Sequence, residues 1–193
     1  MKYSNSLAFV VVIITSFVLL SSNSISEASQ DISSEGKRIY DQLSREFELE
    51  KSQLDKGEPI NKQELMFKGY ALDAVDFTKQ NFKKQLDFSE DSIKTVEECL
   101  DILNKTREEY KPSDKQISVT AKMYVGYIGQ VIKCRWGGEW RDESEYSIKN
   151  GPALKVKEQN LFLLSKVYRR ITGGAEDNLW HFYLVTKNEL ESL

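Results

Sequence analysis

The segment that follows Ser113 constrains the fold of this chain more than any other. Ser113 and Gln116 have the spacing of a capping box, which marks the start of a helix. Residues 114–134 then carry apolar side chains at helical spacing: Val119, Met123, Tyr124, Tyr127, Ile128, Val131 and Ile132. Gly126 and Gly129 lie within this run, although each glycine costs about 1 kcal/mol relative to alanine in a helix. The segment therefore predicts a central, buried helix that approaches another helix closely at its glycines.

Three further helices are predicted before the central one. Apolar residues recur at helical spacing in residues 33–55, after Asn61 and after Ser89. Asn61 and Glu64 have the spacing of a second capping box, and the Lys-Gly-Glu-Pro sequence at 56–59 separates the first helix from the second. Because the first helix has only a thin apolar stripe among many charges, it is a candidate for a detachable arm.

The hydrophobic period changes after Gly137 and Gly138, which suit a helix C-cap and a sharp reversal. Short strands are predicted at residues 139–146, 147–149 and 153–157, with a turn at 150–152 and a further strand at 160–164. A helix at 164–171 and a last helix from Asp177 complete the chain. This order predicts an α+β fold, namely a mostly helical single domain with a small antiparallel β-meander.

The first 28 residues have the three parts of a secretory signal peptide. Lys2 supplies the positive charge, residues 7–20 form an apolar run, and a small-x-small pattern ends at Ala28. The alternative is an uncleaved membrane anchor, but a spanning helix needs about 20 apolar residues. We therefore expect a signal peptide at 1–28, an amphipathic helix and linker at 29–60, and an α+β domain at 61–193. We also expect a secreted or periplasmic location and a mature form that is not embedded in a membrane.

The charge balance bears on the partners. The chain has 27 Lys and Arg residues against 30 Asp and Glu residues, a net charge of -3. Nucleic acids and anionic lipid surfaces select strongly basic surfaces. The balance therefore argues against nucleic acid as a partner.

The most unusual stretch of the sequence surrounds the two glycines that end the central helix. It contains Arg135, Trp136, Glu139, Trp140 and Arg141. Tryptophan and arginine are enriched at protein interfaces, so these five residues are the candidate binding site. The alternative places Trp140 in the core, with Trp136 more exposed.

The two cysteines have two interpretations. In an oxidising compartment Cys99 and Cys134 could form a disulfide, which would stabilise the fold by roughly 3–4 kcal/mol. Alternatively both are buried, reduced thiols on helices, each of which packs as a small hydrophobic side chain. With His181 as the single histidine of the chain, a structural zinc site is not expected.

Neither His181 nor the carboxylates have the pattern of a catalytic motif. A lone histidine acts as a general base only when a partner orients it, and His181 lies in an apolar helical segment, which favours packing. Lys166, Arg169 and Arg170 read as a solvated basic strip. The carboxylates also read as solvated helix faces or strand ends: Glu97, Glu98, Asp101, Glu139, Asp142, Glu143 and Glu145. We therefore expect no catalytic residue, no metal and no cofactor.

Three segments resemble an uncharacterised bacterial domain family. These are residues 86–89 (Leu-Asp-Phe-Ser), the helix with Gly126 and Gly129 that runs into the Trp-Gly-Gly-Glu-Trp sequence at 136–140, and residues 161–171. The likeness spans about residues 67–183, and it departs from the family at Gln130, where an acidic residue is typical. It implies a helical layer that runs into a Gly-Gly-x-Trp turn and a short β-meander, and it implies no activity.

Together these patterns favour an exported, non-enzymatic protein that binds another protein, as an inhibitor, an immunity protein or an accessory of the cell envelope. The alternative is a cell-envelope hydrolase or a glycan-binding protein that uses carboxylates and tryptophans near the meander. An enzyme would require two facing carboxylates or a partnered histidine in a cleft.

Overall fold

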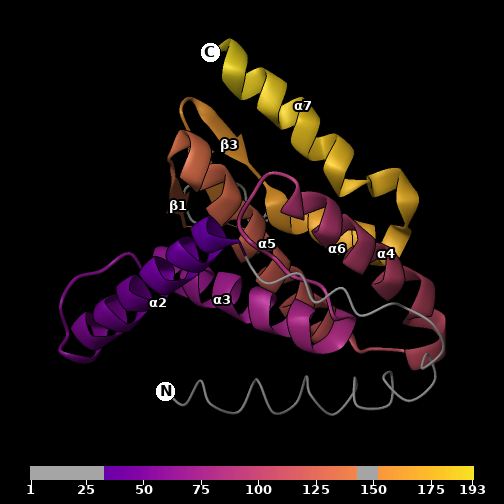
Figure 1. The fold of residues 1–193 in the computed structure, drawn as a ribbon, viewed down its shortest axis with the longest axis horizontal. Coiled ribbons are helices and arrows are strands. Elements are labelled where there is room, and N and C mark those ends of the chain that lie inside the picture. The colour runs from indigo at the N-terminus through magenta and orange to yellow at the C-terminus, as the bar shows by residue number, and fades with distance from the viewer. Residues whose placement is uncertain (1–32, 143–151) are drawn as a thin grey trace.

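The computed structural model describes residues 33–142 and 152–193. This part of the chain forms six α-helices, and Figure 1 shows a small sheet beside them. The elements are α2 (Ser34–Asp55), α3 (Lys62–Phe82), α4 (Ser92–Tyr110), α5 (Asp114–Trp136), β1 (Glu139–Arg141), β2 (Ala153–Val156), β3 (Gln159–Leu161), α6 (Leu163–Gly173), the short 3-10 helix η3 (Ala175–Asp177) and α7 (Leu179–Ser192). The predicted fold class, α+β and mostly helical with a small antiparallel sheet, is confirmed.

Helix α5 is the central helix, as predicted. Eleven of its residues are buried, and it packs against both α3 and α6. The capping box between Ser113 and Gln116 is complete, since each side chain bonds the other residue's backbone. Gly137 ends the helix with a φ of 71°, a conformation that favours glycine. Among the described helices, α5 included, none is both long and apolar enough to cross a membrane.

The two glycines of α5 allow close contacts of different kinds. A Cβ atom on Gly126 would lie 2.6 Å from the carbonyl oxygen of Phe67 and 2.8 Å from the amide nitrogen of Ala71, both in the backbone of α3. The predicted close helix contact is therefore confirmed at Gly126. A Cβ atom on Gly129 would instead meet the indole ring of Trp140 at 2.4 Å.

The sheet is a three-stranded antiparallel meander in the order β1-β2-β3. Trp140 pairs with Leu154, and Lys155 pairs with Asn160. The last predicted strand is shorter than expected, because α6 already begins at Leu163. The predicted strand at 147–149, the far end of the strand at 139–146 and most of the turn at 150–152 lie outside the described residues.

The start of α3 holds the outer edge of β1. The amide of Trp140 donates to Glu64 at 2.8 Å, and its carbonyl accepts from the side chain of Asn61 at 3.1 Å. The indole ring stacks on Phe67 with 3.9 Å between ring centroids. Asn61 caps α3 as predicted, but Glu64 does not return to the Asn61 backbone. Its carboxylate binds Trp140 and Lys133 instead, so the second capping box forms only in part.

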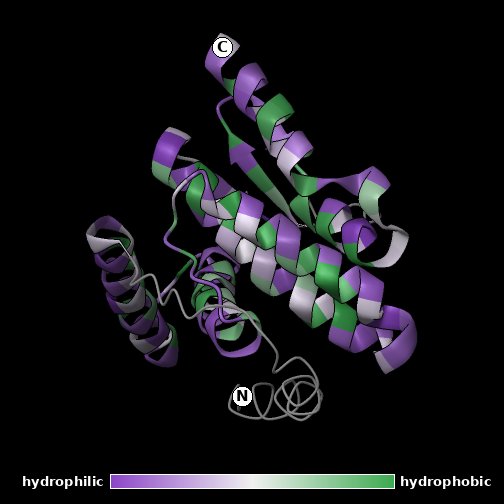
Figure 2. Cartoon of the chain, turned by 45° about the vertical axis from the view of Figure 1, so that its right-hand side comes forward, coloured by the Kyte–Doolittle hydropathy of each residue, from purple (hydrophilic) through white to green (hydrophobic). Residues whose placement is uncertain are grey.

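Helix α2 lies along one side of this body and packs on α3 (Figure 1). Figure 2 colours most of α2 as hydrophilic, and Gly36 and Leu43 are its buried residues. A Cβ atom on Gly36 would meet Asp87 at 2.7 Å, and Phe47 fills the space above Gly69. Helix α2 therefore approaches its neighbours closely at the two glycines but buries few of its own residues.

Gly126→Ala should lower the free energy of unfolding by about 1–3 kcal/mol, because the added methyl group overlaps the backbone of α3. Gly173→Ala is the matched control, since its Cβ atom would come no nearer than 3.8 Å to Asp177. Alanine also favours a helix, so this variant should be as stable as the wild type or slightly more stable. Urea unfolding followed by circular dichroism measures both variants. Equal losses of stability would rule out the close contact as the cause.

Candidate functional site

The five residues of the predicted binding stretch do not form one exposed patch. The side chain of Trp140 is 2% exposed and belongs to the core, which agrees with the alternative given for this residue. Trp136 is half-buried beside Tyr183. Glu139 and Arg141 pair with each other on β1.

Arg135 is occupied by contacts within the chain. Its guanidinium bonds Glu90 at 2.5 Å and Glu191 at 2.6 Å, and Lys187 bonds the same Glu90 at 2.5 Å. These ion pairs join the end of α5 to the start of α4 and to α7. The residue therefore secures α7, and its role in binding a partner stays a prediction.

The two cysteines are free thiols in the structure. Cys99 is buried on α4, where burial raises the pKa of its thiol to about 12 although Tyr124 hydrogen-bonds to it. Cys134 is exposed near the end of α5 and accepts a weak hydrogen bond from Gln130. The structure contains no disulfide between them, and the alternative of two buried thiols on helices holds for Cys99 and is wrong for Cys134.

The prediction of a solvated basic strip on α6 holds for Arg169, whose side chain is exposed, and is wrong for Lys166 and Arg170. Arg170 is only 2% exposed, and its Nε and Nη2 atoms donate to Glu97 at 2.7 Å and to Asp101 at 2.8 Å. Nη1 is also buried and has no hydrogen-bond partner among the described residues. Lys166 and Arg169 both contact Asp177. The basic residues of α6 thus take part in internal ion pairs.

A sequence signal for the burial of Arg170 does exist. Leu163, Val167 and Ile171 are the other buried residues of α6, and Arg170 lies three positions after Val167 and one before Ile171. It therefore occupies the apolar face of an amphipathic helix. A buried arginine requires an acidic partner, which the sequence supplies on another helix 73 residues away.

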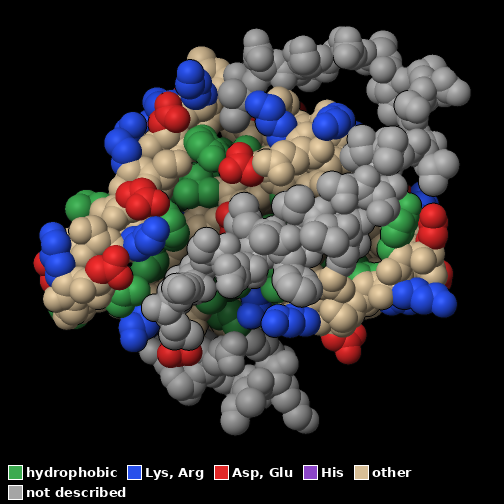
Figure 3. Space-filling model, turned by 90° about the horizontal axis from the view of Figure 1, so that it is seen from below, with side chains coloured by type: hydrophobic (Ala, Val, Ile, Leu, Met, Phe, Trp, Pro, Cys, Tyr) green, Lys and Arg blue, Asp and Glu red, His purple; other side chains and the backbone are tan. Residues whose placement is uncertain are grey.

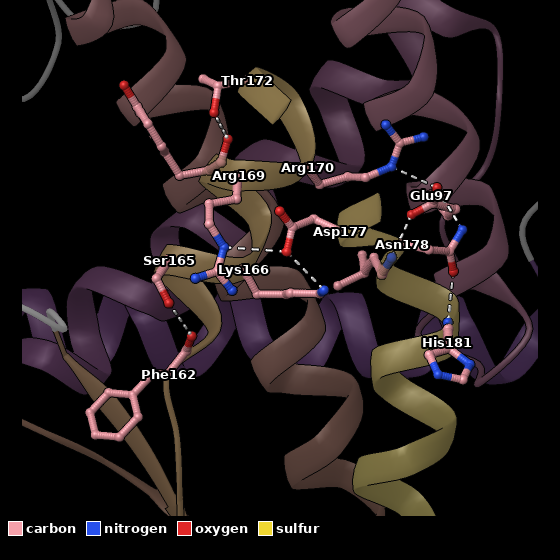
Figure 4. Close-up of polar contacts among 12 residues, drawn as sticks. Glu97, Phe162, Ser165, Lys166, Arg169, Arg170, Thr172, Asp177, Asn178 and His181 are labelled. Atoms are coloured by element: carbon pink, nitrogen blue, oxygen red, sulfur yellow. Dashed lines mark hydrogen bonds and ion pairs between the residues drawn. The ribbon is translucent and has the colours of Figure 1, made fainter. Parts of the chain in front are cut away.

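Glu97 is the centre of this arrangement (Figure 4). One carboxylate oxygen accepts from Arg170 and, at 3.0 Å, from the side chain of Asn178. The other oxygen accepts the amide of Leu179, the first residue of α7, at 2.7 Å. Glu97 thus joins α4 to α6 and α7, and its prediction as part of a solvated face is wrong. The negative charge at the start of α7 also stabilises the helix dipole.

Basic partners hold Asp101 and Asp177 in their charged form. Hydrogen bonds from Lys105 and then from Arg170 lower the pKa of Asp101. Burial acts to raise the pKa of Asp177, but the hydrogen bond from Lys166 and the charge of Arg169 outweigh it and lower the pKa. A general acid must instead keep its proton near the working pH. Asp101 and Asp177 are therefore suited to binding charge and are poor proton donors.

Beside Glu97 and Arg170 lies an open depression of about 450 Å³, which we call the α4–α6 depression. Its lining is mainly charged and comes from α4, α6, the start of η3 and the segments that flank them. Glu98 is 58% exposed and pairs with Lys84 at 2.6 Å, so it is the most accessible carboxylate there. The lining residues are Lys84, Glu97, Glu98, Asp101, Ile102, Arg170, Ala175 and Asn178.

The described residues do not bring a histidine or a group of metal ligands to this site. Figure 4 shows the imidazole of His181 directed away from Glu97 and Arg170, while its backbone amide donates to Asn178. Within residues 33–142 and 152–193, no three metal-binding side chains are grouped so that they could hold an ion. Of the predicted meander carboxylates, Glu143 and Glu145 lie outside the described residues.

Comparison of the chain with protein-family models, with curated proteins and with solved structures found no match. The resemblance to an uncharacterised bacterial domain family therefore stays a prediction.

Arg170→Met should lower the free energy of unfolding by about 3–5 kcal/mol, because it leaves Glu97 and Asp101 charged without their buried partner. Arg169→Met is the matched control one position earlier. Arg169 is 60% exposed, so its loss should cost no more than about 1 kcal/mol. Chemical denaturation of the two variants and the wild type measures the difference. Similar losses in both variants would contradict the structural role of Arg170.

Proposed function

We propose that this chain is an exported, non-enzymatic protein that recognises another protein through the α4–α6 depression. The observation that supports this proposal is an open, charged depression next to a fixed ion-pair network. Small-molecule pockets bury most of their ligand, whereas this depression is open. Here five of the eight lining residues carry a charge, which suits a side chain presented by a protein surface.

The charges of the depression favour a basic side chain from the partner. The lining has two cations, Lys84 and Arg170, and three carboxylates, Glu97, Glu98 and Asp101, which leaves a net charge of -1. Both cations already pair with carboxylates of the lining. Asp101 is already held by Arg170 and Lys105. A lysine or arginine of the partner would therefore pair with Glu98, and charge complementarity of this kind gives specificity.

The face drawn in Figure 3 and the charge of the chain favour a protein partner over nucleic acid. On the coloured part of the face in Figure 3, basic and acidic side chains alternate and form no continuous basic area. The whole chain carries a net charge of -3. A nucleic acid would instead require a strongly basic surface.

Glu98→Arg should abolish capture of the partner, because it reverses the most accessible charge of the depression. Glu108→Arg makes the same charge change on the same helix at a site that is 84% exposed and outside the lining. Tagged protein from residue 29 onward, in wild-type and both variant forms, is incubated with envelope extract and medium of the source cells. Bound proteins are identified by mass spectrometry.

A protein that the wild type and Glu108→Arg retain, and Glu98→Arg loses, would support the proposal. The purified partner would then be titrated against all three forms by calorimetry. Equal binding by the two variants would exclude the depression as the site, and circular dichroism checks that each variant is folded.

Export makes a separate prediction. Expression of the full chain in the source cells should yield protein outside the cytoplasm whose first residue is Ser29, because cleavage is expected after Ala28. Cell fractionation with amino-terminal sequencing measures both properties. Replacing Ala28 with Arg should block cleavage, since the site requires a small residue. Full-length protein that stays in the cytoplasm would refute the signal peptide and leave the binding experiment unaffected.

A further inference from the structure

Helix α2 buries few residues for its length. Gly36 and Leu43 are buried among its 22 residues, whereas the 14-residue α7 buries four. It packs on α3, beside which it lies in Figure 1. Elements with few buried apolar contacts open at lower free energy than the core. Release of α2 alone should therefore be less costly than global unfolding.

Lys68 of α3 forms two ion pairs with α2. Its ammonium group bonds the carboxylate of Glu50 and lies 3.3 Å from that of Glu46, one turn earlier on α2. The side chain of Lys68 is 12% exposed, whereas those of Glu50 and Glu46 are 26% and 43% exposed. Among the ion pairs of the described residues, only these two join α2 to another helix. The charge of Lys68 therefore holds two turns of α2 against α3.

The remaining polar contact between the two helices is weak. The hydroxyl of Tyr40 donates to the exposed carboxylate of Asp76 across 3.4 Å, which is long for a hydrogen bond between oxygen atoms. The ring of Phe47 packs over Gly69 and adds an apolar contact. Lys68 is thus the main electrostatic attachment of α2 to α3.

The connection between α2 and α3 has the features of a hinge. Residues 55–59 are exposed, and Gly57 has a φ of 78° in open space. Asn61, in contrast, is fixed, because it caps α3 and donates to the carbonyl of Trp140. Hinges are short connecting segments that absorb changes in backbone angles. A movement of α2 would therefore take place within residues 56–60 and leave α3 and the sheet in position.

We propose that α2 is an arm that opens about residues 56–60 while the other helices stay folded, and that Lys68 is the clasp that keeps the arm closed. The proposal concerns a conformational equilibrium, and it does not depend on the proposed binding function. Opening separates Lys68 from both carboxylates of α2 and uncovers the α3 surface around Gly69, where Phe47 now packs.

Ionic strength should set how tightly the clasp holds the arm. The carboxylates of Glu46 and Glu50 are partly exposed, so dissolved ions screen their attraction to Lys68. The Debye length falls from about 10 Å in about 0.1 M salt to about 3 Å in about 1 M salt. The arm should therefore open more often as the salt concentration rises.

Native-state hydrogen exchange tests the proposal on protein from residue 29 onward, under conditions where exchange reports the opening equilibrium. Most of the stability of a helix in a protein comes from tertiary packing, so the amides of α2 should exchange whenever the arm opens. Amides of α5 report global unfolding. In the wild type, protection of α2 should be lower than protection of α5, and equal protection would contradict a separate opening of the arm.

Lys68→Met should lower the protection of α2 by about five- to thirtyfold, because both ion pairs to the arm are lost. Lys79→Met makes the same change at an exposed position near the end of α3 and should leave protection of α2 unchanged. Raising NaCl from about 0.1 M to about 1 M should lower α2 protection less in Lys68→Met than in the wild type. Wild-type protection of α2 in Lys68→Met would overturn the role of Lys68 as the clasp.

Val167→Ala separates opening of the arm from global unfolding. It shortens a fully buried side chain of α6, whose contacts an opening arm leaves in place. Protection of α5 should therefore fall by about tenfold or more, and protection of α2 should stay at the wild-type value. If protection of α2 fell together with that of α5, α2 would exchange only through global unfolding, and the proposed arm would be wrong.

Discussion

The position of the sheet depends on how the start of α3 holds Trp140. A two- or three-residue edge strand has too few ladder bonds to be stable alone, and β1 has only three residues. On the side of β1 away from β2, Asn61 donates to the carbonyl of Trp140, and Glu64 accepts the amide of the same residue. The indole ring then fills the space between Phe67 and Gly129. Backbone and side chain of one residue thus connect the meander to α3 and α5, and a substitution of Gly129 would disturb both helices' contact with the sheet.

Features set by near neighbours in the sequence were predictable. The Ser113–Gln116 capping box, the end of α5 at Gly137 and the close approach at Gly126 each depend on a few residues of local pattern. The same reasoning predicted a capping box between Asn61 and Glu64, which forms only in part. The Glu64 carboxylate instead accepts the amide of Trp140, 76 positions away, and pairs with Lys133. Local spacing shows which partners are within reach, and the tertiary fold decides between them.

The candidate site was hidden from the sequence for a physical reason. Charged residues on a helix usually face solvent, so Arg170 and Glu97 read as surface groups. Their burial depends on the crossing of α4 and α6, which places the guanidinium against the carboxylate. The apolar neighbours Val167 and Ile171 were the available signal. The exposed aromatic patch was predicted because tryptophan and arginine are common at protein interfaces. Composition alone does not show that Trp140 turns into the core.

The buried charges around Glu97 and the shallow contact of α2 divide the described helices into a fixed part and a looser one. Around Glu97, each carboxylate oxygen has a donor, and the positive charge of Arg170 lies within hydrogen-bond distance. Charges satisfied in this way fix the helices that carry them, because separation would leave them unpaired in the interior. Helix α2, by contrast, buries only Gly36 and Leu43, and its ion pairs to Lys68 of α3 come from the partly exposed Glu46 and Glu50. Hence α4, α6 and α7 should move as one body, and movement between helices should concentrate at the contact between α2 and α3.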